Sequence, residues 1–97
     1  MFPKDNKRIR FCVFPGYNWC GPGCSGPGYP VNKVDALCKA HDECYRLNGD
    51  RCYCDSELLR RLRPYLAEDT QMGNHARNLH NYMRLQMRFT CRRRRAW

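Results

Sequence analysis

Eight cysteines in a chain of 97 residues constrain its fold more than any other feature. A chain this short buries only about 60–65% of the surface that it exposes when unfolded, so its apolar core alone gives marginal stability. Cysteine at this frequency in a short chain is typical of a disulfide scaffold, and four bridges of about 2–4 kcal/mol each would supply the missing stability. The sequence therefore predicts one disulfide-stapled domain over residues 1–97, folded in an oxidising compartment.

Zinc binding is the alternative use of eight cysteines and three histidines. Structural zinc sites typically use closely spaced cysteine pairs such as C-x-x-C. Here "CGPGC" has three intervening residues, "CYC" has one, and C-x-x-C is absent. The spacings thus favour disulfides over zinc.

The amino-terminal sequence "MFPKDNKRIR" is charged, and no apolar run of signal-peptide length follows it. A leader removed from the chain, or another route of export, would reconcile this with the cysteines. No stretch of about 18 apolar residues predicts a membrane-spanning helix. We expect an extracellular or other oxidising location.

The net charge of +9 is unevenly distributed. Every acidic residue lies at or before Asp69, and residues 70–97 contain seven arginines and no acid. Such a distribution indicates an anionic partner: a phospholipid surface, a nucleic acid or another polyanion. Residues 1–11 form a basic arm and residues 91–97 a basic tail. The tail residues that we expect at an anionic membrane are Arg92, Arg93, Arg94, Arg95 and Trp97. A solvated tail and a nucleic-acid patch are the alternatives.

Local patterns predict a mostly α-helical fold with little or no sheet. Residues 12–32 hold five glycines and four prolines, which predicts a long loop. Helices are expected over 33–47, from about Cys52 to Arg63, and from about Gly73 to Thr90. Pro64 ends the second helix, kinks it or begins the next.

The ends of the first helix carry clear signals. Asn32 is a suitable N-cap, Asp35 lies in the first turn, where the helix dipole favours an acid, and Gly49 suits a left-handed C-terminal position. In the third helix His75 and His80 are expected to be solvated. Its broad apolar face comprises Leu79, Tyr82, Met83, Leu85, Met87 and Phe89. The surface of Leu79, Tyr82, Met83 and Phe89 is expected to lie in the core, with membrane contact as the alternative.

Candidate chemistry is concentrated in "CKAHDECYR", residues 38–46. Cys38, His41, Cys44 and Tyr45 share one face of the first helix, whereas Asp42 points about 100° away. His41 and Asp42 therefore serve different tasks.

On the second helix, Asp55 begins a leucine stripe that should face the core, where a carboxylate needs a partner. If Cys44 bridges Cys54, Asp55 comes next to His41, fixes its tautomer and leaves its other nitrogen free to act as a base.

The stretch "WCGPG" at residues 19–23 presents backbone carbonyls with little side-chain obstruction. Carbonyls together with the Asp42 carboxylate are the hard oxygen ligands that calcium prefers. A Cys20–Cys38 bridge would hold this loop against the first helix and place calcium beside His41.

The sequence "WCGPG", followed by "CKAHDECY" and then "CYCD", resembles the secreted phospholipase A2 family over roughly residues 16–60. The stretch "GYPVNKVDALCKAHDECY" looks like the compact bacterial and parvoviral versions. The resemblance implies two antiparallel helices, a glycine-rich calcium loop and a C-terminal helix.

It further implies that His41 is the general base, that Asp55 orients His41, and that Tyr45 hydrogen-bonds Asp55. The Gly21 amide would stabilise the oxyanion. The implied cofactor is Ca²⁺, and its implied protein ligands are the Asp42 carboxylate and the carbonyls of Trp19, Gly21 and Gly23.

The resemblance also implies the bridges Cys20–Cys38 and Cys44–Cys54. It leaves open the pairing of the other four cysteines, with a slight preference for a bridge that ties Cys91 to the body. A second tyrosine often supports the aspartate in this family, and Tyr53 and Tyr17 are the candidates here.

Together these features predict calcium-dependent hydrolysis of the sn-2 ester of glycerophospholipids at lipid–water interfaces. The alternative is a non-catalytic cationic protein on the same scaffold that disrupts membranes or binds polyanions.

Overall fold

The computed structural model describes residues 12–21, 24 and 26–91. Three α-helices, α1 (Lys33–Asn48), α2 (Arg51–Leu62) and α3 (Gln71–Thr90), follow the loop that begins the described chain. A short 3₁₀ helix, η1 (Arg63–Tyr65), continues directly from α2. The described residues contain no strand. The predicted mostly helical, disulfide-stapled fold is confirmed. Pro64 lies in the first turn of η1, directly after the end of α2.

The helices begin where side chains can cap them. Asn32 accepts the amide of Asp35, Asp50 accepts that of Tyr53, and Thr70 accepts that of Gly73. These bonds satisfy amides that lack a partner within the helix. Gly49 ends α1 with a φ of 81°, a left-handed conformation that favours glycine.

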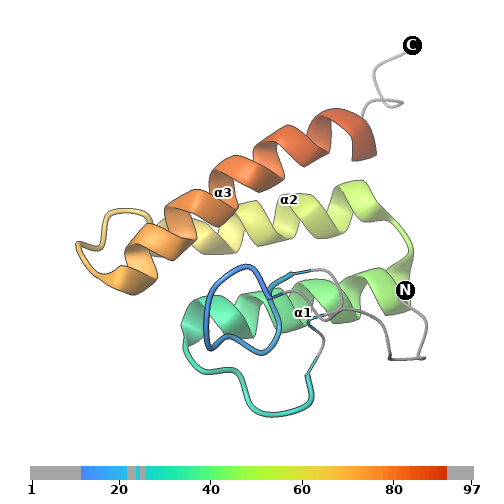
Figure 1. Cartoon of the computed structure of the whole chain (residues 1–97). Coiled ribbons are helices and arrows are strands. Elements are labelled where there is room, and N and C mark those ends of the chain that lie inside the picture. Colours follow the sequence, from blue (N-terminus) through green and yellow to red (C-terminus); the bar gives the residue numbers. More distant parts are fainter. Residues whose placement is uncertain (1–11, 22–23, 25, 92–97) are drawn as a thin grey trace.

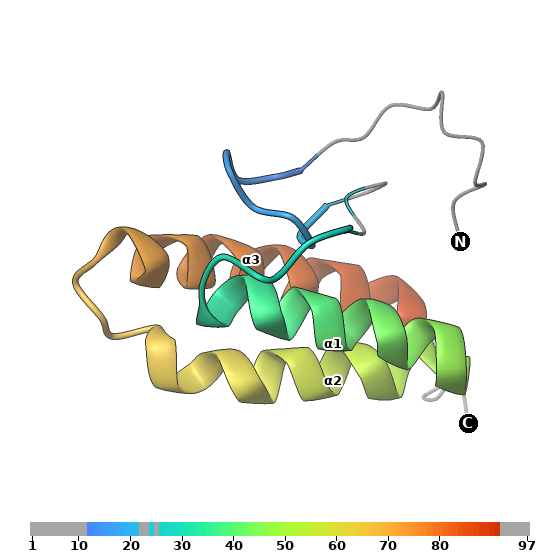
Figure 2. The same ribbon diagram turned by 90° about the horizontal axis from the view of Figure 1, so that it is seen from below.

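α1 and α2 are antiparallel, and α3 packs along α2 (Figure 1). Figure 2 shows the described parts of the loop before α1, residues 12–21 and 26–32, on the side of α1 and α3 that lies away from α2. The core joins all of these parts; its buried members are Phe14, Tyr17, Cys20, Val34, Cys38, Leu58, Leu62, Ala76, Leu79 and Met83. None of the helices in the described part of the chain is long and apolar enough to cross a membrane.

Four disulfides connect the elements. The bridges Cys20–Cys38 and Cys44–Cys54 are those that the resemblance implies. The pairing left open is Cys12–Cys24 and Cys52–Cys91, so Cys91 does tie α3 to the body, through α2. Four bridges fit an extracellular or otherwise oxidising compartment.

Two expectations for α3 hold only in part. Leu79 and Met83 are buried, but Tyr82, Leu85 and Phe89 are 58–70% exposed, because they lie on a flank of α3 that no other described element covers. His75 is not simply solvated: its Nδ1 lies 2.8 Å from the Tyr17 hydroxyl, and its ring stacks on Phe14 with centroids 4.2 Å apart. His75 therefore joins α3 to the loop.

Candidate active site

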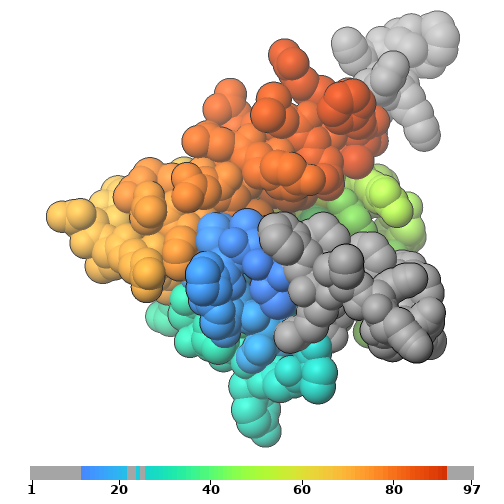
Figure 3. Space-filling view, viewed as in Figure 1, coloured from blue at the N-terminus to red at the C-terminus, as the bar shows by residue number. Residues whose placement is uncertain are grey.

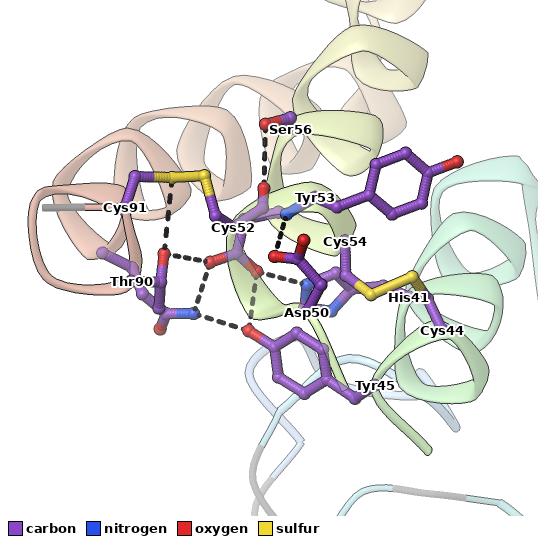
Figure 4. A network of polar contacts seen from close by, with 12 residues as sticks. His41, Cys44, Tyr45, Asp50, Cys52, Tyr53, Cys54, Ser56, Thr90 and Cys91 are labelled. Carbon is purple, nitrogen blue, oxygen red and sulfur yellow. Dashed lines mark hydrogen bonds and ion pairs between the residues drawn. A yellow bond between two sulfur atoms is a disulfide. The ribbon is translucent and has the colours of Figure 1, made fainter. Parts of the chain in front are cut away.

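The imidazole of His41 on α1 contacts the carboxylate of Asp55 on α2, and Figure 4 shows His41 and Tyr45 in the surrounding network of polar contacts. Nε2 of His41 lies 2.7 Å from Oδ1 of Asp55, whose side chain is fully buried, while that of His41 is 12% exposed. The Cys44–Cys54 bridge joins the two helices beside this contact. Asp55 thus engages Nε2 and leaves Nδ1 as the nitrogen available to accept a proton.

Four side chains surround the Asp55 carboxylate. Oδ1 faces His41 and accepts the Tyr45 hydroxyl at 2.6 Å. Oδ2 accepts the Thr90 hydroxyl at 2.8 Å and the Gln86 amide at 3.3 Å. Burial raises the pKa of Asp55, but these hydrogen bonds outweigh burial and hold the pKa below its ordinary value. Asp55 therefore remains a carboxylate at neutral pH.

Tyr45 remains a hydrogen-bond donor in this cluster. Burial and the neighbouring Asp55 carboxylate together raise the pKa of Tyr45 far above its ordinary value. The Tyr45 hydroxyl also accepts the amide of Gln86 at 3.0 Å. The contact between Tyr45 and Asp55 that the resemblance implies is therefore present.

The candidates for a second supporting tyrosine are both wrong. Tyr17 bonds His75 and Asn32, and Tyr53 is half exposed on α2. Gln86 and Thr90 of α3 take that place. The spacing of Gln86 and Thr90 relative to the buried Met83 places all three on the inward side of α3, and this spacing could have indicated that both polar side chains are in the interior. No local pattern in the sequence identified Asp55 as their partner.

The glycine-rich loop, which precedes α1 and includes Trp19 and Gly21, is held against α1 by a disulfide. Cys20, between Trp19 and Gly21, is bridged to Cys38, and Cys38 lies one helical turn before Asp42. Gly21 has a φ of 129°, which favours glycine. Its carbonyl accepts the Cys24 amide at 3.0 Å, which occupies one of the two lone pairs of that oxygen.

The sequence placed Asp35 in the first turn of α1, but its contacts with the loop were not predicted. It is fully buried and accepts three loop amides: that of Trp19 on Oδ1, at 2.8 Å, and those of Asn18 and Val31 on Oδ2, both at 3.0 Å. The helix dipole explains why an acidic residue is favoured in the first turn of α1. The residue is buried because three backbone amides of the loop require an acceptor. Asp35 fixes the backbone next to the Trp19 carbonyl.

The chemistry of the donors fits calcium. Trp19 and Gly21 offer carbonyls, and the half-buried Asp42 offers a carboxylate. Within the described ranges, no cluster of three or more His, Cys, Asp or Glu side chains could hold a metal ion, so this candidate site depends on backbone oxygens. Gly23 lies outside the described residues, as do the tail residues Arg92, Arg93, Arg94, Arg95 and Trp97.

Part of the chain is similar in sequence to known proteins. The phospholipase A2-like domain family matches residues 10–78. The acidic phospholipase A2 homolog taipoxin gamma chain of Oxyuranus scutellatus scutellatus is 48% identical over 40 residues, which cover 41% of this chain and 25% of that protein.

Two viral proteins also match. Capsid protein VP1 of porcine parvovirus (strain NADL-2) is 50% identical over 40 residues, covering 40% of this chain and 6% of VP1. VP1 of feline panleukopenia virus is 46% identical over 46 residues, covering 46% of this chain and 6% of VP1. The chain thus spans a quarter or less of the length of these relatives.

No solved structure matches the chain. The family match covers well over half of the sequence, and it includes the loop, α1, α2 and the His41–Asp55 pair. The chain belongs to the phospholipase A2-like domain family.

Proposed function

We propose that this protein is a calcium-dependent phospholipase A2 that hydrolyses the sn-2 ester of glycerophospholipids at a lipid–water interface. The observation that carries the proposal is the His41–Asp55 pair, with Nε2 engaged by a buried carboxylate. An imidazole held in this way has one orientation and one nitrogen that can accept a proton, which is what general-base catalysis requires.

In the proposed reaction, Nδ1 of His41 takes a proton from a water molecule, and the resulting hydroxide attacks the ester carbonyl directly. Asp55 holds the imidazole and stabilises the imidazolium, and Tyr45 holds Asp55. The Gly21 amide donates a hydrogen bond to the oxyanion, a contribution of roughly 10²–10³-fold for one donor. The imidazolium then returns the proton to the departing glycerol oxygen.

The residues that would hold calcium are Asp42, through its carboxylate, and Trp19, Gly21 and Gly23, through their carbonyls. When bound, the ion would act as a Lewis acid towards the ester carbonyl and neutralise charge on the lipid phosphate. The Cys20–Cys38 bridge and the Asp35 hydrogen bonds support this assignment, because they hold the loop in place in the absence of a metal.

An anionic phospholipid surface is the partner that we infer. His75, Tyr82 and Phe89 are seven residues apart, so they lie along nearly one line on α3. Because His75 contacts Tyr17 of the loop, the exposed Tyr82 and Phe89 face the same side as the loop. Figure 3 shows the loop and α3 on one face of the molecule.

The charge of α3 favours an anionic surface. Arg84 and Arg88 are exposed beside the apolar flank, and α3 contains no acidic residue. Each arginine near an anionic bilayer contributes roughly 1 kcal/mol. An apolar flank with cationic neighbours suits a bilayer interface.

The same flank supports the second candidate function, a cationic protein that disrupts membranes or binds polyanions without hydrolysis. The test is fatty-acid release from phosphatidylglycerol and phosphatidylcholine vesicles, first with calcium and then with chelator. We expect release with calcium that stops with chelator, and more release from the anionic vesicles. Vesicle leakage without free fatty acid would favour the second candidate.

A further inference from the structure

The last turn of α3 reaches the oxygen of Asp55 that faces away from His41. Thr90 donates to Oδ2 at 2.8 Å, and Gln86 donates to the same oxygen at 3.3 Å (Figure 4). Gln86 and Thr90 are four residues apart, so they lie on the same side of α3. They are 31 and 35 residues from Asp55 in the sequence, so this contact depends on the packing of α3 against α2.

A disulfide fixes this contact. Cys91 follows Thr90 directly, and its partner Cys52 lies three residues before Asp55 on α2. The Cα atoms of Cys52 and Cys91 are 4.9 Å apart. The bridge therefore keeps the end of α3 against the first turn of α2, just before Asp55.

The match to the phospholipase A2-like domain family ends at residue 78, before both side chains. The loop, His41, Tyr45 and Asp55 all lie within the match, whereas Gln86, Thr90 and Cys91 lie beyond it. The outer half of the Asp55 hydrogen-bond shell therefore comes from a part of the chain that the family match does not describe.

We propose that Gln86 and Thr90 are positioning residues that hold the Asp55 carboxylate in the orientation that aligns His41. The inference rests on the proposed function of His41 as the general base. Both side chains act on His41 through their hydrogen bonds to Asp55, and Gln86 also acts through Tyr45.

The physical argument concerns rotation of the carboxylate. With Oδ2 unbound, Asp55 could turn about its terminal torsion, which has broad minima. Both of its oxygens would then compete for His41 and Tyr45, and the imidazole would lose its single orientation. Asp55 is fully buried, and a buried acceptor that is left without a donor is costly, which also favours rearrangement. Small losses of alignment at a general base reduce turnover strongly.

The test compares Thr90→Val with Thr90→Ser. Valine has nearly the shape of threonine but donates no hydrogen bond, whereas serine keeps the hydroxyl. We expect Thr90→Val to lower kcat about tenfold with KM unchanged, as for other residues that orient a functional group. Thr90→Ser should restore most of kcat. Equal kcat in Thr90→Val and wild type, or failure of Thr90→Ser to restore what valine loses, would overturn the proposal.

A second measurement does not depend on activity. The Nε2 proton of His41, held by Asp55, gives an NMR resonance whose position and exchange rate report the alignment of the pair. We expect Thr90→Val, and more strongly Thr90→Val with Gln86→Leu, to speed exchange of this proton while the helical circular dichroism is kept. An unchanged resonance in the double variant would contradict the positioning role. Absence of hydrolysis by the wild type would instead refute the proposed function, and the NMR comparison would still decide the positioning.

Discussion

The buried carboxylate of Asp35 accepts the backbone amide of Trp19 at 2.8 Å, and this bond joins the first turn of α1 to the glycine-rich loop. The amides of Asn18 and Val31 bind the other oxygen of the same carboxylate. One side chain therefore fixes two parts of the loop that are 13 residues apart in the sequence, as positions 18 and 31 show. The candidate calcium site is prearranged by a residue that would not touch the metal.

Replacing Asp35 by alanine should therefore weaken calcium binding as well as the fold. Three amides would lose a charged acceptor, and hydrogen bonds to charged groups contribute about 1.5–3 kcal/mol each. We expect the free energy of unfolding to fall by more than about 2 kcal/mol and calcium affinity, measured by calorimetry, to fall at least about tenfold.

Asp50→Ala provides the matched control. Asp50 is exposed and caps α2 through the Tyr53 amide, so its loss should reduce stability by about 1 kcal/mol and leave calcium affinity unchanged. Equal losses of calcium affinity in the two variants would contradict the role given to Asp35.

Acid should weaken the fold through Asp55. Its pKa is lowered in the folded protein, so as the pH falls the unfolded chain takes up this proton first. The stabilisation is complete above the unfolded pKa of about 3.9 and is lost as the pH falls through the folded pKa. Denaturant unfolding at pH values from about 5 to 2 should show the difference in stability between wild type and Asp55→Asn shrinking below about pH 4. A constant difference over this range would count against a stabilising Asp55 carboxylate.

The Cys52–Cys91 bridge closes a longer loop than Cys12–Cys24, with sequence separations of 39 and 12. In the chain-entropy account, loss of the longer bridge costs about 4 kcal/mol and loss of the shorter one about 3 kcal/mol. Paired cysteine-to-serine variants, unfolded in urea, would measure both values. A larger loss from Cys12–Cys24 would show that packing of the loop, not closure of the α3 connection, dominates.

Binding to anionic vesicles should depend on the exposed flank of α3. Arg84→Gln with Arg88→Gln should weaken binding to phosphatidylglycerol vesicles by roughly 2 kcal/mol, and Phe89→Ser should weaken it further. Leu47→Ser is the control, since Leu47 is 75% exposed but lies near the end of α1 and not on α3. Vesicle sedimentation would measure each variant. If Leu47→Ser weakens binding as much as Phe89→Ser does, the membrane lies on a different face.

Local patterns in the sequence predicted the positions of the three α-helices. The N-cap at Asn32, the left-handed Gly49 and the density of glycine and proline before α1 all have short-range causes, so the predicted helix bounds agree with the structure to within about two residues. The contact between His41 and Asp55 was expected from helix periodicity on the condition that Cys44 bridges Cys54, a bridge that the family resemblance implies.

Tertiary contacts account for what was missed. The partners of Asp35 and the α3 donors to Asp55 are set by packing between distant segments, which no short-range pattern encodes. The exposed Tyr82 and Phe89 were misjudged because apolar residues on a broad helix face do not reveal which side another element will cover. Four of the cysteines likewise allowed three pairings until the fold fixed one.

The central claim is that His41 acts as the general base. His41→Gln keeps a donor for Asp55 but removes the basic nitrogen. Fatty-acid release from phosphatidylglycerol vesicles in calcium, compared between wild type and His41→Gln, tests this directly. We predict hydrolysis by wild type and a loss of about 10²–10⁴-fold in the variant, with calcium affinity and unfolding midpoint nearly unchanged. Hydrolysis by His41→Gln at close to the wild-type rate would contradict the claim.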